Sequence, residues 1–118
     1  MNPRITVLTL GVSDLERAVS FYRDGLGWQT KGIIGTEFEN GAVAFFNLEG
    51  GLKLALWPRK SIAADTRLPL HAPSSTELTL GHNVASEEEV RQAMERAAQA
   101  GAVIVKPAGP TFYGGYAG

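Results

Sequence analysis

The sequence predicts an α+β fold built from two tandem βαβββ modules. A short pattern occurs twice, in residues 9–16 (TLGVSDLE) and 80–89 (LGHNVASEEE), and each copy joins a strand-like run to a helix-like run. A repeat of this kind indicates one supersecondary unit used twice. With 118 residues, 44% of them hydrophobic, the chain can enclose one modest core. We therefore expect one domain with internal pseudo-symmetry.

The first module, residues 4–58, opens with a strand and a helix. The run 5–12 is rich in β-branched and aliphatic residues, so it predicts a strand whose alternate side chains share one face. Ser13 and Glu16 are spaced as in a capping box, and apolar residues recur at helical spacing behind them. This helix is expected to end at the glycines at positions 25 and 27.

Three strands follow in the first module, and turn signals separate them. Asn40 and Gly41 predict a type I′ hairpin turn, because both central positions of that turn favour this pair. Gly50 and Gly51 predict the next turn. The expected strands are 28–34, 42–48 and 52–57.

The second module, residues 76–118, repeats the first in shorter form. Ser86 and Glu89 form a second capping box, and Gly101 closes the helix that they open. Too few residues follow this helix for three strands of usual length, so the module is expected to lack its last strand. Its expected strands are 77–84 and 102–106.

Residues 59–75 are expected to link the two modules within a single domain, residues 1–118. They contain prolines and show little periodicity. Such a composition is typical of a connecting loop. One turn of helix is expected inside it, around 62–65.

Charge and composition exclude several classes of partner. The 11 basic and 12 acidic residues are scattered and give a net charge of -1, so no block suits nucleic acid or an anionic membrane. Cysteine is absent, which excludes disulfides, thiolate nucleophiles and cysteine metal sites. No run approaches membrane-spanning length and no leader-like segment opens the chain. We expect a cytoplasmic protein.

The repeat resembles the vicinal oxygen chelate superfamily, which includes glyoxalase I, extradiol dioxygenases, and bleomycin- and fosfomycin-resistance proteins. The similarity rests on the two βαβββ patterns, on 10–15 (LGVSDL), on Phe21 and Tyr22, and on 26–28 (LGW). It implies that each module curls its sheet into a half-barrel around a small-molecule cavity, often with a divalent metal. In many members a segment like 112–118 (FYGGYAG) precedes one more strand. We expect a longer natural chain to supply that strand, the alternative being that it is supplied in another way.

The resemblance also implies four metal-ligand positions, and no ligand stands at those that can be assigned. The positions on the first and fifth strands correspond to Val7 and Thr79, neither of which is a normal metal ligand. The fourth strand contains no carboxylate, and the eighth strand is not in the sequence. His82 falls on the opposite strand face from Thr79, and His71 lies in the linker. Both histidines are expected to be structural or solvated.

The predicted site is a cavity with aromatic walls. Apolar surface with a few hydroxyl and amide groups is the usual composition of a small-molecule site. We expect Phe46, or its neighbour Phe45, to form a wall and Arg59 to meet an anionic ligand at the rim. The bland alternative is that the aromatic residues fill the sheet interiors. The candidate ligand-binding residues are Thr9, Phe46, Trp57, Arg59, Asn83, Tyr113 and Tyr116.

These observations favour a protein that binds a small organic molecule in an aromatic-lined half-barrel, without the usual metal or another cofactor. One alternative is a metal-dependent lyase or dioxygenase, with Zn, Ni, Mn or Fe held by residues of a missing C-terminal strand. Another is a cofactor-free isomerase or lyase that transfers protons with Tyr, Asp or Glu. The resemblance implies a homodimer, which the unpaired sheet edge of a short second module also favours. The sequence identifies no catalytic residue.

Overall fold

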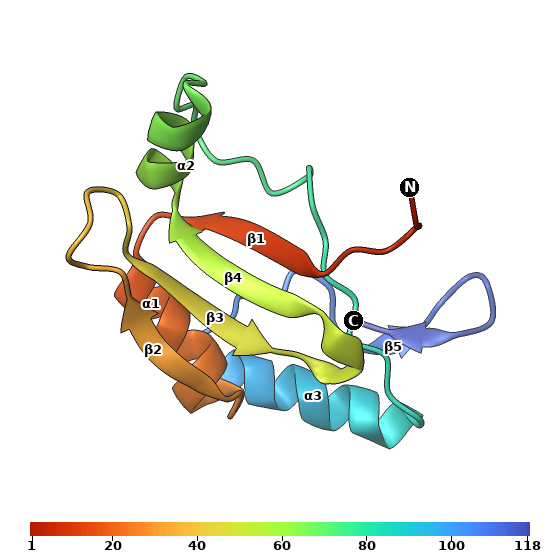
Figure 1. Ribbon diagram of the computed structural model, residues 1–118. Coiled ribbons are helices and arrows are strands. Elements are labelled where there is room, and N and C mark those ends of the chain that lie inside the picture. The colour runs from red at the N-terminus through yellow and green to blue at the C-terminus, as the bar shows by residue number, and fades with distance from the viewer. The chain divides into compact units, whose positions relative to one another are not determined.

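The computed structural model describes every residue from Met1 to Gly118, and the chain forms two compact units. The first unit is Met1–Ala72 and the second is Pro73–Gly118, so the boundary falls inside the predicted linker. A four-stranded sheet lies in the first unit and a two-stranded sheet in the second (Figure 1). None of the helices is long and apolar enough to cross a membrane.

The sheet of the first unit has the strand order β1-β4-β3-β2 (Figure 1). β1 runs parallel to β4, and the other neighbouring strands are antiparallel. The expected βαβββ order of the first module is therefore confirmed. The strands are β1 (Val7–Val12), β2 (Thr30–Ile34), β3 (Val43–Asn47) and β4 (Lys53–Pro58).

Helix α1 (Leu15–Ser20) begins one residue later than the predicted capping box requires. The side chain of Asp14 accepts a hydrogen bond of 3.0 Å from the backbone N–H of Arg17. Asp14 is therefore the N-cap, and the prediction of a Ser13 cap was wrong. Ser and Asp are comparable N-caps, so the cap type alone could not choose between adjacent positions. The carboxylate of Asp14 also complements the positive end of the helix dipole.

The helix ends in a π-helical turn, η1 (Phe21–Gly25). The N–H of Leu26 donates to the carbonyl of Phe21 at 3.0 Å, which is the wider i to i+5 spacing. Tyr22, in this turn, packs its ring against Trp28 and Phe46, with centroid distances of 5.3 and 5.8 Å. Burial raises the pKa of the Tyr22 hydroxyl.

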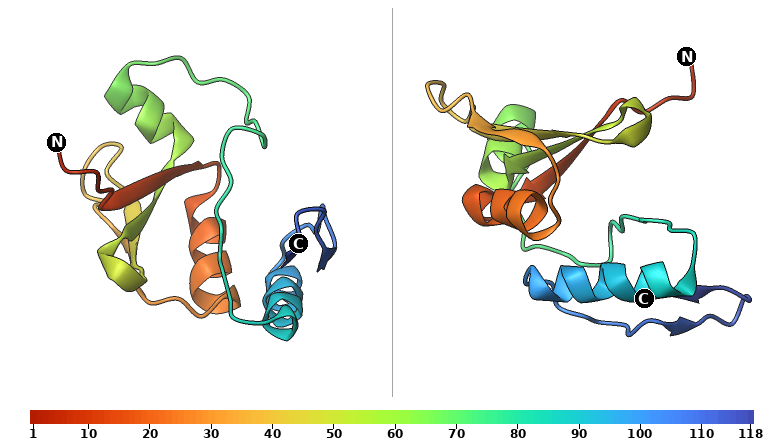
Figure 2. Two further views of the ribbon diagram at one scale, coloured as in Figure 1. Left: turned by 90° about the vertical axis from the view of Figure 1, so that its right-hand side faces the viewer. Right: turned by 90° about the horizontal axis from the view of Figure 1, so that it is seen from below.

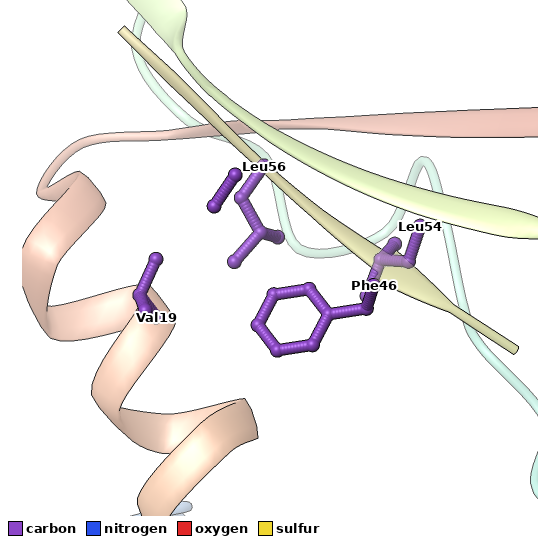
Figure 3. Close-up of a cluster of buried hydrophobic side chains, with 5 residues drawn as sticks. Val19, Phe46, Leu54 and Leu56 are labelled. Atoms are coloured by element: carbon purple, nitrogen blue, oxygen red, sulfur yellow. The ribbon is translucent and has the colours of Figure 1, made fainter. Parts of the chain in front are cut away.

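One face of the four-stranded sheet packs against α1 to form the core (Figures 1 and 3). Phe46 from β3 and Leu54 and Leu56 from β4 are fully buried, and Val19 of α1 points toward them. Phe46 was predicted to line the cavity, but it lies in this core. Adjacent side chains on a strand point to opposite faces, so Phe45 lies on the other side of the sheet.

The connection between β2 and β3 is longer than the predicted two-residue turn. It covers residues 35–42, so the type I′ hairpin was wrong, although Asn40 does adopt a left-handed backbone with φ of 56°. The Gly41 N–H donates to the Phe38 carbonyl at 3.1 Å. A Cβ on Gly41 would lie 2.5 Å from the carbonyl oxygen of Gly35, so the two glycines permit this close approach. The predicted turn at Gly50 and Gly51 is confirmed within η2 (Glu49–Gly51).

Helix α2 (Arg59–Thr66) follows β4 directly and is longer than the single turn expected around 62–65. Pro58 stands at its N-cap, where its missing N–H costs no helical hydrogen bond. A Cβ on Gly11 would lie 3.0 Å from Cγ of Arg59 and 3.2 Å from Cδ1 of Ile62. The absence of a side chain at Gly11 therefore lets α2 pack over the end of β1.

The second unit packs helix α3 against a short hairpin (Figure 2). The predicted cap at Ser86 is confirmed, because its Oγ accepts the N–H of Glu89 at 3.2 Å. The Glu89 carboxylate reaches back as expected, but it accepts the N–H of Ala85, one residue before the N-cap, at 2.8 Å. Gly101, with φ of 106°, stands just beyond the end of the helix as expected. The elements are α3 (Glu87–Gln99), β5 (Gly109–Pro110) and β6 (Tyr116–Ala117).

The two strands predicted in the second unit are not formed. Residues 77–84 and 102–106 belong to no sheet, and several of their apolar side chains are exposed. β-branched and aliphatic residues favour a strand only where a neighbouring strand satisfies the backbone N–H and C=O groups. The exposed side chains include Leu78, Leu80, Val103, Ile104 and Val105.

We predict that Phe46→Ala lowers the free energy of unfolding by about 3–5 kcal/mol, because it leaves a cavity in a fully buried core. Phe45→Ala is the matched control on the same strand. Phe45 is 39% exposed on the opposite face, so its loss is expected to cost less than about 1.5 kcal/mol. Urea unfolding followed by circular dichroism measures both values. Equal losses would contradict the assignment of the two faces.

The position of the α1 cap gives a second prediction. Asp14→Ala removes the side-chain acceptor for the Arg17 N–H and is expected to cost about 1 kcal/mol in the free energy of unfolding. Ser13→Ala removes no cap and is expected to change it by less than about 0.5 kcal/mol. The same urea titration measures both values. A larger loss of unfolding free energy in Ser13→Ala would instead support Ser13 as the N-cap.

Candidate functional site

The sheet face opposite α1 carries a hollow of about 280 Å³. Small-molecule sites are commonly about 300–1,000 Å³, so the volume of this hollow is just below that range. Side chains from β1, β3 and β4 and the backbone of the β2–β3 loop surround it. The lining residues are Thr9, Gly41, Val43, Phe45, Ala55 and Trp57.

Strand register explains why these residues meet. Ala55 of β4 lies between Thr9 of β1 and Phe45 of β3 in directly paired positions. Ala55 is only 3% exposed, and its small side chain leaves room above the sheet between larger neighbours. Trp57 lies two residues farther along β4 and therefore on the same face. The hollow is thus a consequence of placing a small residue at the centre of this face.

The mouth of the hollow is held by a hydrogen bond between a strand and a loop. The indole N–H of Trp57 donates to the backbone carbonyl of Asn40 at 2.9 Å. This bond satisfies the polar edge of the indole and leaves its ring as apolar wall. Gly41, the next residue of the loop, lines the hollow beside it. The bond and the glycine-dependent loop therefore fix one end of the site.

Two of the predicted site residues on the first unit, Thr9 and Trp57, lie together in the hollow. Thr9 supplies the only side-chain hydroxyl of the lining. Phe46 was predicted to form a wall, but it lies in the core. Its neighbour Phe45 lines the hollow instead. Arg59 is the first residue of α2, and its guanidinium donates a hydrogen bond to the backbone carbonyl of His71.

The other three predicted residues belong to the second unit. Asn83 is exposed in the segment that forms no strand, and Tyr113 is exposed with its ring edge-on to Phe112. The hydroxyl of Tyr116 accepts a hydrogen bond of 3.0 Å from Arg91, whose guanidinium lies 5.4 Å from the ring centroid. That hydrogen bond, together with one to Glu88, raises the pKa of Arg91. Tyr116 is therefore engaged within its own unit.

The exposed face of the sheet does not fit a divalent metal. Val7, at the position that the family resemblance assigns to a ligand, shares this face with Thr9 but has no donor atom. β4 contains no His, Asp or Glu. Nowhere in the chain do three His, Cys, Asp or Glu side chains come together. The nitrogen and oxygen donors that such a metal prefers are therefore not assembled here.

Sequence reasoning did not select Gly41, Val43 or Ala55 as site residues. A usable signal was present, because a strand with Trp57 facing the site must also turn Ala55 toward it. The same alternation places Val43 and Phe45 on one face. The sequence pattern does not show which face of the sheet α1 covers.

Comparison with known protein families gives a match over nearly the whole chain. The sequence model of the Glyoxalase/Bleomycin resistance protein/Dioxygenase superfamily matches residues 4–118. A comparison with curated proteins gave no match. The family match covers both structural units.

Solved structures show the same relationship. A glyoxalase-related enzyme from Fulvimarina pelagi is 33% identical, with 97% of this chain and 76% of that chain covered and a TM-score of 0.76. A glyoxalase/bleomycin resistance protein/dioxygenase from Nocardioides is 28% identical, with 96% and 72% covered and a TM-score of 0.71. A lactoylglutathione lyase from Agrobacterium tumefaciens, 23% identical with 98% and 83% covered and a TM-score of 0.58, shares the fold. The chain therefore belongs to the Glyoxalase/Bleomycin resistance protein/Dioxygenase superfamily.

Proposed function

We propose that this protein binds a small organic molecule with an aromatic or branched apolar body in the hollow of the β1-β4-β3-β2 sheet, without a metal. The observation that carries the proposal is the lining itself. Five of its six residues are apolar or glycine, and the sixth is Thr9. Such a surface attracts an apolar body and offers one hydroxyl to orient it.

The walls suit a flat ring. Phe45 and Trp57 stand on adjacent strands, and aromatic side chains gain from offset or edge-to-face contact with a ligand ring in addition to the area that they bury. Both walls are held before a ligand arrives, because Trp57 is hydrogen-bonded to the loop and both strands rest on the core. A preorganised site loses less entropy on binding.

Binding is favoured over catalysis by the chemistry of this face. β1–β4 contain no His, Asp or Glu that could serve as a general acid or base on the ligand. The Agrobacterium tumefaciens relative is a lactoylglutathione lyase, but at 23% identity it supports the fold and not its reaction for this chain. We therefore place this protein with ligand-binding members of its superfamily.

Removal of an aromatic wall tests the proposal. Phe45→Ala is expected to raise the dissociation constant for naphthalen-1-ylmethanol, a neutral aromatic probe, about tenfold. Backbone amide shifts in ¹⁵N-labelled protein measure this constant and report where the probe binds. Phe38→Ala is the matched control, since Phe38 is 68% exposed and lies outside the lining. Unchanged affinity in Phe45→Ala, or equal losses in both variants, would refute the proposed site.

Metal dependence gives an independent test. Because no metal-ligand set is assembled, the affinity for the same probe is expected to be equal with excess EDTA and with excess Mn²⁺, Ni²⁺ or Zn²⁺. Elemental mass spectrometry of the purified protein accompanies the titration. A stoichiometric metal whose removal weakens binding about tenfold or more would instead support the metal-dependent alternative.

A further inference from the structure

Building on the proposed function, we infer that the ligand is an organic anion, with its apolar body in the hollow and its carboxylate at the ammonium group of Lys53. This assignment rests on the hollow being a binding site, and Lys53 itself lies outside the lining.

Lys53 shares the face of the hollow. It lies two residues before Ala55 in β4, while Leu54 and Leu56 point into the core, so alternation directs Lys53 to the side of Ala55. Two residues along a strand span about 7 Å. The flexible four-carbon stem of lysine can cover that distance toward a group bound beside Ala55.

Lys53 is also a cation without a partner. Its backbone N–H donates to the Thr6 carbonyl at 2.9 Å, but its ammonium group makes neither an ion pair nor a hydrogen bond, unlike the guanidinium groups of Arg23 and Arg91. None of the four strands contains Asp or Glu, so no negative charge on the sheet opposes it. A second lysine, Lys31, stands in the irregular part of β2. The sheet therefore carries positive charge in a chain whose net charge is -1.

Neutral donors stand beside Lys53. Asn47 of β3 is directly paired with it, and Asn47 lies two residues beyond Phe45, on the same face. The hydroxyl of Thr9 is in the next row, opposite Ala55. An ammonium and an amide therefore stand at one end of the site and a hydroxyl in its central row, and a carboxylate can accept hydrogen bonds from all three kinds of donor.

The opposite end of the hollow is apolar, and Arg59, the cation that follows it in the chain, already makes a hydrogen bond. Trp57 and Val43 line that end, and the indole N–H is satisfied by the Asn40 carbonyl. Arg59, which the sequence predicted as the rim cation, donates a hydrogen bond to the His71 carbonyl. This asymmetry orients an amphipathic anion with its ring toward Trp57 and its charge toward Lys53.

Three probes with the same ring and different charge test the inference: 1-naphthoate, naphthalen-1-ylmethanol and 1-naphthylmethylammonium. We expect affinity to fall in that order. Lys53→Met keeps an apolar stem and removes the charge, and it is expected to weaken naphthoate binding about three- to tenfold while changing the alcohol by less than about twofold. Lys60→Met, which removes an exposed charge from α2, is the matched control and is expected to bind all three like the parent protein.

The outcomes separate this inference from the proposed function. If Lys53→Met leaves naphthoate affinity unchanged while Phe45→Ala still weakens the alcohol, the site stands and the role of Lys53 is refuted. Equal losses of naphthoate affinity in Lys53→Met and Lys60→Met would show that the effect comes from the net charge of the protein. That result would also refute the role of Lys53. If none of the probes binds, the hollow is not a site for this class of molecule, and both proposals fail.

Discussion

The alternation of side chains across the β1-β4-β3-β2 sheet decides which residues form the core and which form the hollow. Phe46, Leu54 and Leu56 are buried against α1, and this burial supplies the main apolar stabilisation of the first unit. The same backbone must then direct Phe45 and Ala55 to the opposite face. The core thus determines which residues line the hollow, and a change of register by one residue would exchange the two sets.

Several local features hold this face in its shape. The π-helical turn brings Tyr22 against Phe46 behind the sheet, and Gly11 lets α2 pack over the end of β1. The 35–42 loop needs small residues where Gly35 approaches Gly41, and it supplies the carbonyl that receives the Trp57 N–H. These contacts stabilise walls that are present without a ligand. The site is therefore part of the fold and not of a separate mobile element.

Sequence patterns predicted the first unit well because its signals were local and mutually consistent. The strands and helix followed from periodicity of 2 and 3.6, and the family resemblance agreed with the later match over residues 4–118. The N-cap of α1 is Asp14 and not Ser13, and the sequence could not choose between them because both residue types cap helices well. Phe46 was assigned to the cavity because two adjacent aromatic residues give no sign of which one faces the helix.

The second unit shows where local signals were insufficient. The runs 77–84 and 102–106 have strand composition, but no partner strand pairs with them. Strand formation depends on non-local hydrogen bonds, which composition does not reveal. Lys53 was not among the predicted site residues for a related reason. It belongs to no motif, and only the strand register places it on the face of Ala55. The homodimer and the cytoplasmic location stay predictions.

If ligands bind on the sheet face that α1 leaves uncovered, a bound ligand must lie within a few ångströms of the side chains that line the hollow. Intermolecular nuclear Overhauser effects between the ring protons of bound 1-naphthoate and assigned side chains would detect this proximity. We expect contacts to Phe45, Trp57 and the methyl group of Ala55, all on the lining of the hollow. Contacts confined to residues of α1 or of the second unit, with none to these three side chains, would contradict binding on this face.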